Sequence, residues 1–86
     1  MNFEYNRAKS QVNKSKHGMD FDEAQILWSD PFRIEIQAKS LSESRFMVVG
    51  KIDNKHWSAI ITYRDNIIRI ISVRRAKKSE VKLYES

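Results

Sequence analysis

Residues 66–76 read NIIRIISVRRA, and this stretch decides how the rest of the chain is arranged. From Ile67 to Val73, five residues are Ile or Val, which is typical of a β-strand. The two alternating sets of side chains, which begin at Ile67 and Ile68, are both mostly apolar. The pattern therefore predicts a central strand that is covered on both faces.

A cationic run, RRAKK, follows this strand at residues 74–78. Side chains alternate along a strand, so Arg74 and Arg75 are predicted to point to opposite faces. Only one of them can then line a given groove. A solvated strand end that leads into a helix is the alternative explanation of the run.

Composition limits the class of protein. The chain has 86 residues, which predicts one domain over residues 1–86. It has no cysteine, which excludes disulfides and thiolate metal sites and favours a reducing cytoplasm. No apolar run approaches the roughly 20 residues of a membrane span, so a soluble, cytoplasmic protein without a membrane partner is expected.

Charge points to a polyanion as a partner. Sixteen Lys and Arg residues against eleven Asp and Glu residues give a net charge of +5. The basic residues crowd the two ends of the chain, at Arg7, Lys9, Lys14 and Lys16 and at Arg74, Arg75, Lys77, Lys78 and Lys82. If these ends meet in space, they form a phosphate-binding face.

Capping signals predict two N-terminal helices. Asn6 is expected to cap a helix over residues 7–16, which ends at Gly18. Asp20 and Glu23 have the spacing of a capping box, which predicts a second helix to about Trp28. Between the two basic ends lies an acidic patch, Asp20, Asp22, Glu23 and Asp30, and helix capping explains it without a catalytic or metal function.

From Pro31 onward the pattern changes to a period of two. It predicts strands at 32–38, 45–52 and 56–63 and from 67 onward, with a mobile polar loop at 40–44. Residues 2–5 are an additional candidate for a short edge strand, and residues 77–84 are predicted to be a short helix. The expected fold is α+β, with two N-terminal helices, a four-stranded antiparallel meander and a C-terminal helix. Helices would cover one sheet face, and a shallow basic concavity would form the other.

The residue types available suit one kind of chemistry. Neither His17 nor His56 has metal-ligand spacing to other residues, and two glycines cannot build a phosphate loop, so no metal or cofactor is expected. RNA carries its own nucleophile, the 2′-hydroxyl. Cleavage then needs a proton acceptor, a proton donor and cations on the phosphate, which His, Arg and Lys can supply.

Each candidate also has a structural explanation. His17 precedes a helix-ending glycine and can cap the last carbonyls, whereas His56 at a strand start is typical of a surface residue. Arg64 lies in a predicted turn, where arginine is usually exposed. Tyr84 has helical spacing from Val81, which is common in core packing.

Several motifs together resemble the BrnT family of toxins. They occur in the order Phe3-x-Tyr5-Asn6-x-x-Lys9, Asn13-x-x-Lys16-His17-Gly18, Phe21-x-Glu23-Ala24, Asp30-Pro31, Arg45, Gly50, Thr62-x-Arg64 and Arg69-Ile-Ile-Ser-Val-Arg-Arg-Ala76, followed by Glu80 and Tyr84. The resemblance spans nearly the whole chain. It implies a RelE-like fold and a metal-independent endoribonuclease that inhibits translation.

The resemblance also suggests functional residues. The catalytic candidates are His17, Arg64, Arg74 and Arg75, and the RNA-binding candidates are Lys9, Lys16, Lys77 and Tyr84. Two departures stand out. Tyr5-Asn6 replaces the usual Trp-Asp, so no role of that carboxylate can be transferred, and Glu43-Ser44 stands where a pair of acids is common.

The implied partner is a BrnA-like antitoxin of the ribbon-helix-helix type, in a toxin–antitoxin hetero-oligomer that reaches DNA only through the antitoxin. Its contacting segment is expected to be acidic, or to pack a helix against exposed apolar residues such as Trp28 or Trp57. A non-catalytic module of the same fold, which binds nucleic acid or a partner, is the alternative function.

Overall fold

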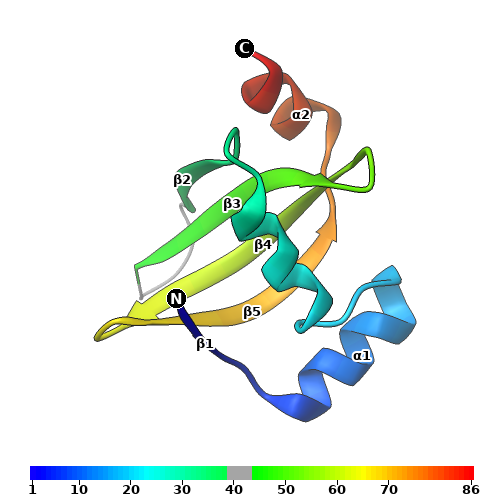
Figure 1. The fold of residues 1–86 in the computed structure, drawn as a ribbon. Helices are drawn as coiled ribbons and strands as arrows, with labels where there is room; N and C mark the ends of the chain where they lie inside the picture. The colour runs from blue at the N-terminus through cyan, green and yellow to red at the C-terminus, as the bar shows by residue number, and fades with distance from the viewer. Residues whose placement is uncertain (39–43) are drawn as a thin grey trace.

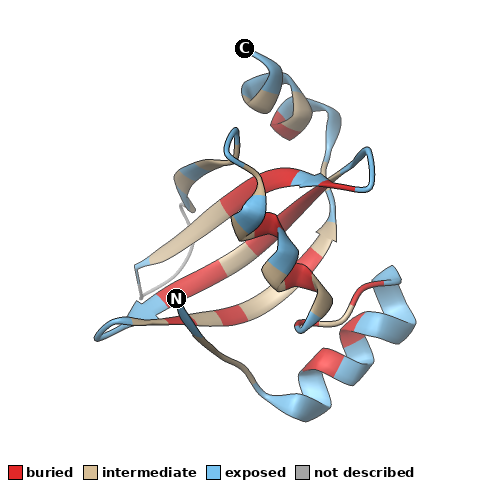
Figure 2. Ribbon diagram, viewed as in Figure 1, coloured by how far each residue is buried: buried red, intermediate tan, exposed pale blue. Residues whose placement is uncertain are grey.

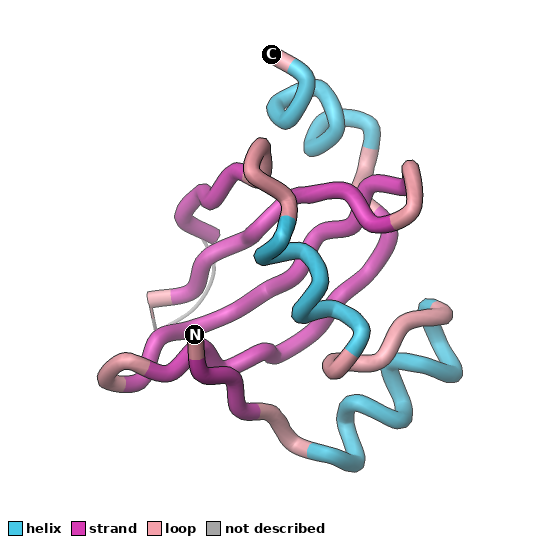
Figure 3. Tube along the Cα trace, in the orientation of Figure 1, coloured by secondary structure: helices cyan, strands magenta, loops and turns pink. Residues whose placement is uncertain are grey.

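The computed structural model describes residues 1–38 and 44–86 and shows a mixed sheet with helices at one face, one flank and one end (Figure 1). The elements are β1 (Asn2–Glu4), α1 (Arg7–His17), η1 (Glu23–Ser29), β2 (Ile34–Ala38), β3 (Arg45–Ile52), β4 (Lys55–Arg64), β5 (Ile67–Arg75) and α2 (Lys78–Glu85). Figure 3 shows them by type along the trace. The loop predicted at 40–44 lies, except for Ser44, outside the described residues.

The sheet has five strands in the order β1-β5-β4-β3-β2, so the prediction of a four-stranded antiparallel sheet was wrong. The strands β2 to β5 form the predicted antiparallel meander. In addition, β1 pairs with β5 in parallel, with Phe3 opposite Ile68. This added strand covers the edge of β5 from Ile67 to Arg69 and makes the first part of β5 an interior strand, as its run of β-branched residues predicted. Beyond Arg69, this edge of β5 has no neighbouring strand among the described residues.

A β-bulge changes which residues of β5 share a face. Ile61 pairs with Ile70 but Ile60 pairs with Ser72, so Ile71 is an extra residue in β5. Before the bulge Ile68 and Ile70 face the core, and after it Val73 does, with at most 6% exposure each. The predicted alternation therefore describes each half of the strand but not the strand as a whole, because the extra residue reverses it. The two faces of β5 are also not equally apolar.

The second predicted helix is a 3-10 helix rather than an α-helix. Asp20 and Glu23 do form the capping box: each backbone N–H donates to the other residue's carboxylate, at 3.0 and 2.7 Å. The buried residues Phe21, Ala24 and Leu27 are three apart. Ala24 and Leu27 belong to η1, whose three residues per turn place both on the sheet, and Phe21 lies in the turn before it.

The core lies between η1 and one face of the sheet (Figures 1 and 2). Gly50 permits this close contact, because a Cβ there would meet the Leu27 side chain at 3.0 Å. Trp57, proposed above as an exposed contact for a partner, is only 7% exposed, since it belongs to this core. The strand predicted at 32–38 begins later, at Ile34, since Phe32 precedes β2 and is 75% exposed.

Polar side chains, rather than an apolar stripe, hold α1 against the sheet. The Asn13 amide donates to the carbonyls of Met19 and Val73 at 2.7 and 2.8 Å and accepts from the Val73 N–H at 3.3 Å. The Ser10 hydroxyl accepts from the Phe21 N–H. Asn6 caps the helix as predicted, and Gly18 ends it at φ 83°. The two buried residues of α1 are thus Ser10 and Asn13.

Polar contacts also hold α2 at one end of the sheet. The Tyr84 hydroxyl donates to Asp30 at 2.6 Å, and this hydrogen bond raises the pKa of Tyr84 to about 12. The same Asp30 carboxylate accepts from the backbone N–H groups of Phe32 and Lys51. The loop before β2, the end of β3 and the end of α2 are therefore held together through one carboxylate.

Candidate nucleic-acid interface

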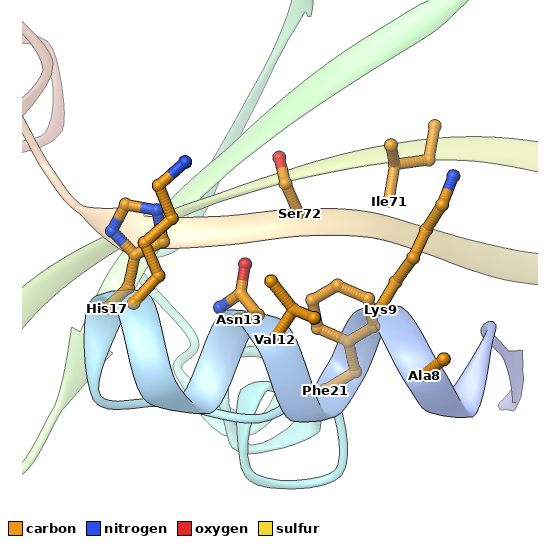
Figure 4. A pocket seen from close by; sticks show the side chains of 9 residues that line it. Ala8, Lys9, Val12, Asn13, His17, Phe21, Ile71 and Ser72 are labelled. Carbon is orange, nitrogen blue, oxygen red and sulfur yellow. The ribbon is translucent and has the colours of Figure 1, made fainter.

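A groove runs between α1 and the second half of β5, and three predicted site residues line it. Lys9, Lys16 and His17 come from α1, and the groove has a volume of about 440 Å³. Its other lining residues are Ala8, Val12, Asn13, Phe21, Ile71 and Ser72. Figure 4 shows the α1 side chains rising toward Ile71 and Ser72 on β5. We call this the α1–β5 groove.

The imidazole of His17 is not needed to cap α1. The Gly18 N–H already donates to the carbonyl of Lys14 at 2.9 Å, which satisfies the usual C-terminal cap. His17 is exposed and lines the groove instead. Within residues 1–38 and 44–86 the His17 imidazole makes no hydrogen bond to a carbonyl of α1, so the capping role considered for this histidine is not observed.

Arg74 lies on the same face of β5 as Ser72, two residues along the strand. Its guanidinium is held by Glu80 of α2, with both terminal nitrogens 2.8 Å from the carboxylate oxygens. Glu80 also accepts from the Ser58 hydroxyl and the Lys77 N–H. The bond from Arg74 holds the pKa of Glu80 down at about 2, so the buried Glu80 carboxylate, paired with the half-buried Arg74, stays ionised at neutral pH.

The sheet face opposite η1, which we call the open face, also carries Arg64 and Arg69 at its far end. Both lie near the Glu4 carboxylate, at 3.7 Å for Arg64 and 3.0 Å for Arg69. Between these arginines and Arg74, the open face is lined by half-buried residues: Ile36, Met47, Ile60 and Ser72. The arginines of the open face are therefore separated by an apolar strip.

The remaining predicted site residues lie elsewhere. Arg75 is on the η1 side of the sheet, with its guanidinium carbon 5.5 Å from the centre of the Trp57 ring, so it and Arg74 do face opposite ways. Lys77 is exposed at the N-cap of α2. Tyr84 is engaged with Asp30. The structure brings together Lys9, Lys16 and His17, but it does not gather all eight residues at one place.

Residues that sequence reasoning missed include Glu80 and Ser72. Glu80 is three residues after the N-cap Lys77, which is the acidic position of a capping box, and that spacing was a usable signal. Alternation did place Ser72 on the same face of the strand as Arg74. It did not place Ser72 on the same face as Arg69, because the extra residue at Ile71 has no clear sequence signature.

Within residues 1–38 and 44–86, no three His, Cys, Asp or Glu side chains gather as a metal ion would require. No helix in that part of the chain is long and apolar enough to cross a membrane.

A small α+β domain with basic residues along one groove and one sheet face has the features of a nucleic-acid-binding protein. The comparisons specify the class further. Residues 5–80 match the family model described as the ribonuclease toxin BrnT of type II toxin–antitoxin systems, and the chain belongs to this family. No significant match to a curated protein was found. The family consists of ribonuclease toxins, which act on RNA and have an antitoxin partner.

Proposed function

We propose that this protein is a metal-independent endoribonuclease toxin that cleaves RNA through the ribose 2′-hydroxyl, with His17 at the reacting groups. The observation that carries the proposal is that His17, Lys9 and Lys16 line one groove whose wall is formed by β5. Imidazole exchanges protons near neutral pH, and ammonium groups attract phosphates.

The proposed reaction needs only groups of the chain and of the RNA. The 2′-oxygen attacks phosphorus while its proton passes to a base, and the bond from phosphorus to the 5′-oxygen breaks as that oxygen takes up a proton. The products are a 2′,3′-cyclic phosphate and a 5′-hydroxyl. His17 is the proton-transfer group, and lysine and arginine side chains stabilise the charge on the phosphorane.

In this proposal Arg74, two residues beyond Ser72 on the same face of β5, is the arginine that contacts the phosphate. Its terminal nitrogens are oriented by Glu80, which leaves further N–H groups of the guanidinium for a phosphate. Arg64, on the same face, and Lys77, near Arg74, would contact more distant phosphates. Arg75 lies on the other face and packs over Trp57, so it is the candidate least suited to contact the phosphate.

Neutralisation by a BrnA-like antitoxin completes the proposed function, together with the inhibition of translation that follows from RNA cleavage. An acidic segment of the antitoxin would pair with the same lysines, which speeds association. The two proteins would form a hetero-oligomer that contacts DNA only through the antitoxin.

A non-catalytic binding module is the second candidate, and a specific observation favours it. Arg64 and Arg74, two of the four catalytic candidates, are near carboxylates that offset their charge, at Glu4 and Glu80. Such pairs are common in purely structural roles. Binding to RNA would then remain without cleavage.

Cleavage of RNA by the purified chain, with and without EDTA, separates the two candidates. We expect cleavage in both samples, with cyclic phosphate and 5′-hydroxyl ends. His17→Gln should reduce the rate at least about 100-fold, whereas His56→Gln, which changes a histidine bound to Glu85, should retain activity. Products with 5′-phosphate ends, loss of cleavage in EDTA, or a fully active His17→Gln protein would refute the proposed mechanism.

A further inference from the structure

We propose that the α1–β5 groove is a nucleobase-binding subsite, which holds one unpaired base of the RNA between Val12 of α1 and Ile71 and Ser72 of β5. This inference rests on the proposed function and adds to it, since it assigns a place for the base rather than for the reacting phosphate.

The first argument is the reversed burial of α1. A surface helix normally places its apolar residues on the core and its polar residues in water. Here Ser10 and Asn13 are buried, and Val12 is 63% exposed. Hydrogen bonds to Val73 and Met19 hold the helix, so folding does not require the apolar residues at its groove side. Val12 and Ala8 are thus left available for a ligand.

The second argument is the shape and chemistry of the groove. Its lining exposes more apolar than polar surface, and its volume of about 440 Å³ accommodates a planar base with part of its ribose. Apolar contact with a base does not depend on its sequence-specific edge. The Ser72 hydroxyl in the wall can donate to or accept from that edge, which gives the subsite one polar group for selectivity.

The third argument is the charge at the rim, which favours a nucleotide over an apolar protein side chain. Lys9 and Lys16 are two helical turns apart, which is about 10.5 Å along the axis, and both are exposed. Ammonium groups on either side of an apolar groove suit a base whose flanking phosphates lie at its two ends. His17 follows Lys16 at the same end, next to the position of one such phosphate.

Fluorescence anisotropy with short single-stranded RNA tests the inference. The probe is an oligonucleotide with 2′-O-methyl groups throughout, which prevents cleavage, and it is compared with the same strand made abasic at every position. Because a buried base contributes strongly to single-strand binding, we expect the abasic strand to bind about tenfold more weakly.

Variants then locate the base. Val12→Asn should weaken binding of the intact strand about fivefold and leave binding of the abasic strand unchanged. Gln11→Asn, at an exposed position that does not line the groove, should change neither. Because the Val12 side chain is exposed, its substitution should not disturb the core. A thermal melt of the variant verifies that its stability is unchanged.

The outcomes are distinct. Equal affinities of the wild-type protein for intact and abasic strands, or equal effects of Val12→Asn on both, would overturn the subsite while RNA binding itself stands. Val12→Asn could also leave RNA binding normal and abolish binding of the antitoxin. That result would show that the groove binds a protein, and it would overturn the nucleobase subsite. A wild-type protein that neither binds nor cleaves RNA would refute the proposed function as well.

Discussion

Glu80 is the residue on which the most interactions converge. Its carboxylate accepts from Arg74, Ser58 and the Lys77 N–H, and it joins β4, β5 and α2. A buried carboxylate that joins three elements both stabilises the fold and orients the arginine proposed to contact phosphate. Its substitution should therefore affect stability and activity together.

We predict that Glu80→Ala lowers the free energy of unfolding by about 3 kcal/mol, because it leaves the Arg74 guanidinium without its partner. Glu85→Ala is the matched control on the same helix. Its carboxylate is 55% exposed and pairs with His56, so it should cost less than about 1 kcal/mol. Urea denaturation measures both, and similar losses for the two variants would contradict the prediction.

The pKa of Glu80 also predicts a dependence on pH. The folded-state pKa of about 2 lies below the ordinary value of 4.5, so the ionised carboxylate stabilises the fold fully above about pH 4.5. That contribution should decrease as the pH falls from about 4.5 to 2. Thermal melts of wild type and Glu80→Gln over this range should converge toward low pH, and a constant difference would argue against the assigned pKa.

Asn13 has the corresponding role on the other flank, since it takes the place of a neighbouring strand at the free edge of β5. We predict that Asn13→Ala costs about 2 kcal/mol, because the backbone N–H and carbonyl of Val73 lose their partner in a buried site. Ser15→Ala, at an exposed position of α1, should cost little. If the two variants have equal urea midpoints, the amide does not hold the helix.

At the scale of elements, the sequence predicted the parts with strong local signals. The caps at Asn6 and Gly18 and the bounds of β3 were correct, because capping and alternation depend on neighbouring residues. The parallel pairing of β1 and the bulge at Ile71 were not predicted, because both depend on contacts distant in the sequence. The 3-10 form of η1 was not predicted either, because a three-residue spacing of buried residues also fits one face of an α-helix.

The turn between β3 and β4 offers a prediction at this scale. Asp53 and Asn54 have φ values of 50° and 66°, as in the two-residue hairpins that favour glycine at the second position. We predict that Asn54→Gly stabilises the protein by about 0.5 kcal/mol, since glycine adopts positive φ without strain.

Asn66→Gly in the following turn is the control for this prediction. Asn66 does not have a positive φ, so glycine there only increases the freedom of the unfolded chain and should destabilise slightly. A thermal melt that shows the same direction of change for both variants would contradict the argument.

At the scale of the molecule, the two basic ends meet only in part. Asn13 of α1 contacts Val73, next to Arg74, whereas α2, which carries Lys78 and Lys82, lies apart from α1 (Figure 1). The contact of α1 with β5 brings part of the predicted site together, namely Lys9, Lys16 and His17 beside β5. Arg75 and Tyr84 could not be excluded from the sequence, because their partners Trp57 and Asp30 are distant along the chain. The RelE-like character of the fold stays a prediction.

The salt dependence of RNA binding tests the arrangement of these charges. If Lys9, Lys16 and Arg74 each neutralise one phosphate, the logarithm of the affinity should fall with the logarithm of the salt concentration with a slope of about −2 for a single strand. Lys9→Ala should make the slope shallower by about 0.7. Lys51→Ala removes the same charge from the end of β3, beside Asp30 and Tyr84 and away from the α1–β5 groove, and should leave the slope unchanged. Anisotropy titrations at several salt concentrations give these slopes. Equal slopes for the wild type and Lys9→Ala would show that the groove lysines do not contact phosphate, and the RNA would then have to bind on another face of the protein.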